Sequence, residues 1–216
     1  MNGYYLQFTL ACLMSIGVGC TSAPVHYYTL APPPDKTLPA SRISFAIDVR
    51  VVHAPPQLNG SELMVRTGPT EVMLLDNERW ASPVNDEIKD ALRLELQRRL
   101  SRMTGLRPAF TKLTLDIDVQ HLEAEFGRYA WLEASWSATL SATGQRSNGG
   151  RTTTCAFQAD EKIHAGYAEI VEGYQRAIAA LADAIADALM SPASGSEASC
   201  QNSIAGSAGG SGSKGH

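Results

Sequence analysis

Three stretches of the sequence alternate apolar and polar residues, and this alternation limits the fold more than any other feature. The stretches are RISFAIDVRVVH (42–53), LTLDIDVQHLEAEF (113–126) and YAWLEASWSATLSA (129–142). A period of two is typical of a strand with one buried face. A weaker stretch at 152–163 and a short hairpin around Gly68-Pro69 add further strands. Strands of this kind belong to a mixed or antiparallel sheet with one face covered.

Two helices are predicted to cover that face. Ser82 as N-cap and Pro83 introduce a segment that carries an apolar stripe at Val84, Ile88, Leu92, Leu96 and Leu100. A second helix is expected over 167–190, and Pro192 ends it. Its apolar spacing also fits a coiled-coil seam, but docking on the sheet is the favoured interpretation.

The expected element order is β, ββ, α, β, β, β, α, which predicts an α+β fold. We expect a two-layer sandwich with a mostly antiparallel sheet and both helices packed on one face. A single domain over residues 41–191 would contain it. The chain has 216 residues and is 44% hydrophobic, so it has enough apolar side chains for one core.

The first 19 residues have the pattern of a signal peptide. An apolar run from Tyr5 to Val18 is too short to span a membrane comfortably, and Gly19 precedes Cys20 as in a bacterial lipobox. Cleavage before Cys20 would leave a lipidated cysteine at the mature N-terminus. The alternative is an ordinary signal peptide in which Cys20 is a coincidence.

The two ends of the mature chain differ from the domain in composition. Residues 20–40 are rich in Pro, Ser and Thr and are expected to form a flexible tether, with YYTL as a candidate short strand. Residues 192–216 are rich in Gly and Ser and are expected to be disordered. Cys155 and Cys200 are the remaining cysteine pair, and they are either bridged in an oxidising compartment or unrelated thiols.

Composition and motifs argue against several classes of function. The net charge of −4 gives no electrostatic footprint for nucleic acid. The histidines are scattered, and neither a metal-binding spacing nor a nucleophile elbow nor a phosphate loop occurs. We therefore expect no cofactor, no metal and no catalytic residues.

One short segment, NERWASPV, remains as a candidate contact site. Trp80 stands just before the predicted helix, and Arg79 precedes it. The simpler interpretation is that Trp80 folds back on the first helical turn as a hydrophobic staple. The alternative is that Arg79 and Trp80 contact a partner, with Trp80 as a partly exposed anchor.

Several segments together resemble the ABC-type transport auxiliary lipoproteins, the group that includes the paraquat-inducible membrane-integrity lipoprotein. The resemblance rests on the lipobox cysteine and on five segments between about residues 25 and 190. These are YYTL, HAPPQLNGSELMVRTG, LLDNERWASPVNDEIKDALRLELQRRL, FGRYAWLEASWSATL and YAEIVEGYQRAIAALADAIADAL.

The resemblance implies a non-enzymatic accessory role. Members of this group are envelope lipoproteins that work with mammalian-cell-entry (MCE) proteins and an ABC transporter permease to move lipids between membranes. Thr21, where an inner-membrane protein would have Asp, implies the periplasmic face of the outer membrane. Homo-oligomerisation is left open. The competing hypotheses are a periplasmic lipoprotein hydrolase and a purely structural envelope lipoprotein.

Overall fold

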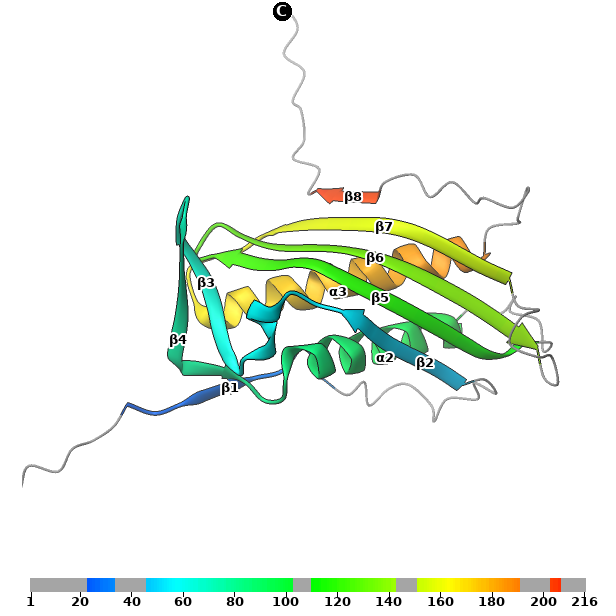
Figure 1. Ribbon diagram of the computed structural model, residues 1–216, viewed down its shortest axis with the longest axis horizontal. Coiled ribbons are helices and arrows are strands. Elements are labelled where there is room, and N and C mark those ends of the chain that lie inside the picture. The colour runs from blue at the N-terminus through cyan, green and yellow to red at the C-terminus, as the bar shows by residue number, and fades with distance from the viewer. Residues whose placement is uncertain (1–22, 34–45, 103–109, 143–150, 191–202, 207–216) are drawn as a thin grey trace, which may run out of the picture.

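The computed structural model describes residues 23–33, 46–102, 110–142, 151–190 and 203–206. Within these ranges eight strands form one sheet, and two α-helices cover one face of it (Figure 1). The α+β prediction is therefore confirmed. In chain order the elements are β1 (His26–Tyr28), β2 (Ala46–His53), the 3-10 helix η1 (Pro56–Asn59), β3 (Glu62–Gly68), β4 (Glu71–Trp80), α2 (Val84–Arg102), β5 (Phe110–Glu125), β6 (Tyr129–Ala142), β7 (Arg151–Lys162), α3 (Tyr167–Met190) and β8 (Ser203–Gly206).

The sheet is mixed, and β5 is its organising strand. Along one edge β5 pairs antiparallel with β6, which in turn pairs antiparallel with β7. The other edge of β5 pairs with two strands. Strand β2 pairs parallel with the first half of β5, and β3 pairs only with the last residue of β5. The β1–β4 and β7–β8 pairings are also parallel. The longest pairings are thus antiparallel, and the parallel ones lie around them.

The alternation in the sequence corresponds to the two faces of this sheet. Leu113, Leu115, Ile117 and Val119 of β5 are all buried, while the residues between them are partly exposed. All five apolar residues of the predicted α2 stripe are likewise buried. The hydrophobic core therefore lies between the inner face of the sheet and the two helices.

Helix α3 docks on the sheet, as the favoured interpretation predicts. It packs on β6 and β7 and lies against α2. It lies close to the sheet at Gly173, where an added Cβ would lie 2.6 Å from Ile163 Cγ2 and 2.8 Å from Ala130 Cβ. Arg99 of α2 also forms an ion pair with Asp183, which joins the two helices.

Two strands lie in segments for which the sequence predicts a tether and a disordered tail. Strand β1 lies within residues 20–40, and the short strand expected at YYTL is found at His26–Tyr28. Strand β8 lies within residues 192–216 and pairs with β7 through residues 157–160. The candidate strand at YYTL thus has a counterpart in β1, whereas the sequence does not predict β8, and each of the two segments adds a strand to an available sheet edge. The signal peptide lies outside the described residues.

Candidate functional site

The segment that follows the expected anchor cysteine is fixed to the folded head. Strand β1 pairs parallel with the end of β4, with His26 opposite Glu78 and Tyr28 opposite Trp80. The backbone amide of Ala81 then donates a hydrogen bond to the carbonyl of Tyr28, at 2.7 Å. These backbone bonds make β1 an integral edge of the sheet.

Immediately after β1 in the sequence, the chain is held by the buried carboxylate of Glu87 in the first turn of α2. Its Oε2 accepts hydrogen bonds from the Thr29 hydroxyl at 2.7 Å and from the Leu30 amide at 2.8 Å. Its Oε1 accepts one from the Ser82 hydroxyl at 2.6 Å. We call these four residues the N-terminal junction. Since an acid near a helix N-terminus is also favoured by the helix dipole, each part of this arrangement supports the others.

A second buried carboxylate, Glu78, binds the side chains of β1. Its oxygens contact His26 Nδ1 at 3.0 Å and the Tyr28 hydroxyl at 2.7 Å. Burial alone would raise the pKa of Glu78, but the hydrogen bonds from His26 and Tyr28 outweigh it, so the pKa lies below its usual value. Burial, with the hydrogen bond to Glu78, raises the pKa of Tyr28 to about 12.

Both helices hold the residues that follow β1. Gln175 of α3 donates to the Thr29 carbonyl at 3.1 Å, and Arg98 of α2 donates to the Pro33 carbonyl at 2.6 Å. The Leu30 side chain is only 1% exposed. The prediction of a flexible tether therefore does not hold from His26 to Pro33. Six residue steps separate Cys20 from His26, and they span at most about 20 Å.

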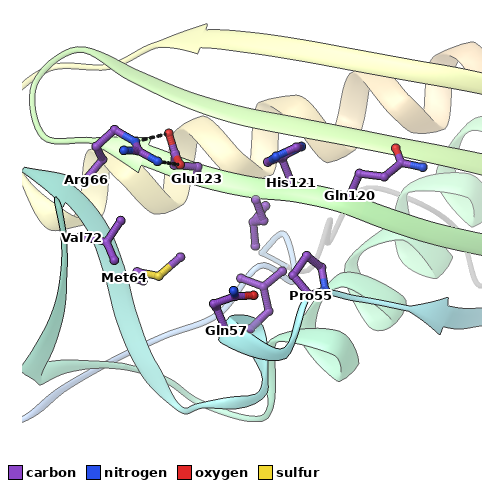
Figure 2. A pocket seen from close by; sticks show the side chains of 10 residues that line it. Pro55, Gln57, Met64, Arg66, Val72, Gln120, His121 and Glu123 are labelled. Carbon is purple, nitrogen blue, oxygen red and sulfur yellow. Dashed lines mark hydrogen bonds and ion pairs between the residues drawn. The ribbon is translucent and has the colours of Figure 1, made fainter. Parts of the chain in front are cut away.

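A groove of about 330 Å³ lies beside this region, on the edge of β5 between β2 and β3. It exists because β2 pairs with β5 only as far as Asp118, while β3 meets β5 at Glu125. A register shift in β5 between Val119 and His121 falls in the same gap. The lining residues are Pro55, Gln57, Leu58, Met64, Arg66, Val72, Gln120, His121, Leu122 and Glu123 (Figure 2).

The charged groups of the groove bind one another. Figure 2 shows Arg66 and Glu123 facing each other, and their two hydrogen bonds measure 2.6 and 2.5 Å. The Tyr129 hydroxyl donates to the same carboxylate at 2.9 Å. The Arg66 hydrogen bond is the main reason that the pKa of Glu123 lies below its usual value, and burial opposes it. This pairing fixes the shape of the groove. Because Arg66 and Glu123 bind each other, their charges are not available to bind a substrate.

The histidine of the groove is also engaged. His121 stacks on Trp131 with ring centroids 4.7 Å apart, and its Nδ1 lies 3.0 Å from a carboxylate oxygen of Glu133. Among the described residues, no group of three or more His, Cys, Asp or Glu side chains could hold a metal ion. The groove therefore has an apolar surface, and the polar side chains at its rim are paired with one another. Such a surface is suited to binding a partner.

The structure places the sequence-predicted residues in different environments. Trp80 is only 5% exposed and lies 6.2 Å from the ring of Tyr174, so the prediction of an exposed aromatic contact is wrong for this residue. Trp80 is the last residue of β4, where β1 pairs with the strand and the ring of Tyr174 packs nearby. Arg79 is partly exposed, donates to the Asp76 carbonyl and pairs with Glu62.

The cysteines are described only in part. Cys155 is buried in β7 and is disulfide-bonded. Cys20 and Cys200 lie outside the described residues. Lipidation of Cys20 and the pairing of Cys155 with Cys200 therefore stay predictions.

Sequence reasoning missed both buried carboxylates and the groove. A signal for Glu87 was present, since an acid stands between Val84, Ile88 and Ala91 on the core-facing side of the helix. The groove has no local signal, because it arises from how far two distant strands extend along β5.

Comparison with known proteins decides the family. The family model for the ABC-type transport auxiliary lipoprotein component matches residues 28–186, which begins at Tyr28 in β1 and ends within α3. The chain belongs to this family. Its members are lipoproteins that assist ABC-type transport, and this family therefore places the chain among lipid-anchored envelope proteins. In the described part of the chain, no helix is long and apolar enough to cross a membrane.

A solved structure shares the fold of this family member. A crystal structure of an uncharacterized protein aligns with a TM-score of 0.57 at 20% identity, covering 77% of this chain and 99% of the other. Protein XCC0632 from Xanthomonas campestris, of family model DUF330, aligns with a TM-score of 0.48 at 18% identity, covering 76% and 91% of the two chains. No curated protein matches the sequence significantly.

Proposed function

We propose that the chain is a non-enzymatic auxiliary subunit of an MCE/ABC-type system that moves lipids between the two membranes of the envelope. In this role it is anchored by a lipid on Cys20 and contributes to membrane integrity. Family membership supports the transport role. The observation that carries the proposal is the N-terminal junction, because it fixes Thr29 and Leu30, a short distance along the chain from Cys20, to the first turn of α2.

A rigid junction defines where such a head can act. With at most about 20 Å of chain between Cys20 and His26, the head stays close to the membrane that holds it. Anchoring raises its effective concentration at that surface, so a partner meets it without a search through the periplasm. An MCE-domain protein or a permease would therefore have to reach this membrane. Thr21 supports the outer membrane as the location.

The groove is the proposed contact for the transport partner. Its apolar residues Leu58, Met64 and Leu122 offer a surface for a partner's side chains, while Arg66 and Glu123 bind each other at its rim. Mutual pairing of the charged groups supports binding over hydrolysis. A hydrolase would need a nucleophile and a base directed at a substrate.

The test is site-specific photo-crosslinking of the lipidated protein in intact envelopes. A crosslinker at Gln57, which is exposed at the groove, should capture an MCE-domain protein or an ABC permease. The matched control is Gln158 on the outer face of β7, where capture should be at least about tenfold weaker. The proposal fails if Gln57 captures neither class of protein. Lipid hydrolysis by the purified protein would instead support the enzyme hypothesis.

A further inference from the structure

The exposed apolar side chains of the protein are gathered at one end. Seven large apolar residues of the described ranges are exposed, and six of them lie on β1 or just before it, on β4 or in the β5–β6 turn, at the left end of Figure 1. Only Met190, at the far end of α3, lies elsewhere. We call these six residues the apolar end: Val25, Tyr27, Val72, Met73, Leu74 and Phe126.

The centre of the apolar end is the free edge of β4. Strand β1 covers β4 only from Glu78 to Trp80, so the preceding part of β4 pairs with β3 alone. Val72, Met73 and Leu74 are 48%, 48% and 56% exposed. Successive residues of a strand point to opposite faces, so apolar groups are exposed on both faces of this edge.

The chain leaves the molecule toward this same end. In Figure 1 the described residues before β1 lie at the left end of the molecule, which is also where β4 lies. Cys20 is six residues before His26, so the anchor can lie at most about 20 Å from the start of β1.

We propose that the apolar end rests on the lipid bilayer that holds the anchor. The inference depends on lipidation of Cys20 in the proposed function, which brings a bilayer within about 20 Å of this end. A protein strand that paired with the β4 edge would leave the apolar side chains on its two faces exposed. A protein surface packed on one face would leave the other face exposed. A bilayer interface also accommodates both faces together with Tyr27 and Phe126 from two other elements, and aromatic rings are favoured at that depth.

The charges near the apolar end are compatible with this contact. Arg128 pairs with Glu125, and His26 contacts Glu78. The exposed acids Glu71 and Asp76 flank the apolar residues of β4, and their negative charge does not favour anionic lipid. The contact should therefore depend little on anionic lipid. The free backbone groups of the β4 edge need water or headgroups, which limits the contact to the interfacial layer.

The test uses the lipidated full-length chain in phosphatidylcholine vesicles with no other protein present. Spin labels are attached at Leu74→Cys and, as the matched control, at Met190→Cys, and an unsubstituted chain reports any labelling of native cysteines. Collision with oxygen, relative to a water-soluble nickel complex, measures immersion of each label. We expect this ratio to be at least about threefold higher at position 74 than at position 190. A label at Phe126→Cys gives a second reading if Leu74→Cys fails to fold.

Three results would overturn the inference. Equal, water-like ratios at positions 74 and 190 would place the apolar end in solution. Short distances between the position 74 labels of two molecules would make it an interface between copies. Immersion that requires an added MCE-domain protein would assign it to that partner. If instead the wild-type chain fails to co-float with vesicles, the anchor assignment and the proposed function fail first.

A complementary measurement uses the unlipidated Cys20→Ser protein. Replacing Met73 and Leu74 with Ser should lower its weak partition into phosphatidylcholine vesicles by about tenfold, since half-exposed apolar area is removed. Met190→Ser should leave the partition unchanged. Equal partition of all three proteins, with unfolding curves confirming that each is folded, would contradict the proposal.

Discussion

The backbone amide of Leu30 donates a hydrogen bond to the side chain of Glu87, 57 positions further along the chain, at 2.8 Å. This one contact joins the segment that follows the expected lipid anchor in the sequence to the first turn of α2. It is shielded from water, because Leu30 is 1% exposed and Glu87 is 5% exposed. The position of the head relative to its membrane therefore depends on a carboxylate in a helix of the core.

Glu87→Ala should release the N-terminal segment. The change leaves three hydrogen-bond donors without their acceptor, and we expect a loss of about 2 to 4 kcal/mol in the free energy of unfolding. Hydrogen exchange should show faster exchange of the Leu30 amide than in the wild-type protein. Asp90→Ala, an exposed acid of the same helix, is the control and should change stability by less than about 0.5 kcal/mol. Unchanged protection at Leu30 would refute the role given to Glu87.

Gly173→Ala should destabilise the protein although alanine favours helix. The propensity gain of about 1 kcal/mol is opposed by contacts of the new methyl group with Ile163 and Ala130, both under 3.0 Å. We expect a net loss of about 1 to 3 kcal/mol in denaturant unfolding. The neighbouring exposed substitution Glu172→Ala serves as the control. A stabilised Gly173→Ala protein would contradict the close packing of α3 on the sheet.

Glu123→Gln should weaken the protein at neutral pH and matter less in acid. The pKa of Glu123 is below its usual value in the folded protein, so its stabilisation is present above the unfolded pKa of about 4.3 and is lost as the pH falls through the folded pKa. We expect a difference of about 1 to 3 kcal/mol between wild type and variant at pH 7. Unfolding curves at decreasing pH should show this difference shrinking, and a constant difference would contradict the Arg66–Glu123 assignment.

The predicted disulfide can be checked directly. Cys155 is disulfide-bonded, and we predict Cys200 as its partner. Digestion of periplasmic protein without reduction should yield one linked pair of peptides that contain these two cysteines. A bridge from Cys155 to any other cysteine, or a free Cys200 thiol, would show that the prediction is wrong.

Local patterns in the sequence were sufficient for most of the sheet and both helices. The alternation at Leu113–Val119 and the stripe from Val84 to Leu100 each bury one face, so the local pattern and the tertiary contact agree. Trp80 was open to two interpretations because nothing beside it in the sequence shows that Tyr174 and β1 cover it.

The groove and the docked β1 required long-range information. The groove follows from the extents of β2 and β3 along β5, and a pairing register between distant parallel strands leaves no local pattern. For β1, the available signal was a group of large apolar residues within a Pro-rich segment, namely Tyr27, Tyr28 and Leu30. Its partners Glu78 and Glu87 look like ordinary surface acids until the fold buries them.

If the head works as a membrane-anchored auxiliary subunit, its activity depends on the anchor, and complementation of a deletion strain under envelope stress measures this directly. The strain receives either the lipidated protein or a Cys20→Ser head exported behind a cleavable signal peptide, at matched levels. We predict that the lipidated form restores resistance and sediments with membranes, while the Cys20→Ser head is folded, soluble in the periplasm and inactive. Full complementation by the soluble head would contradict the account.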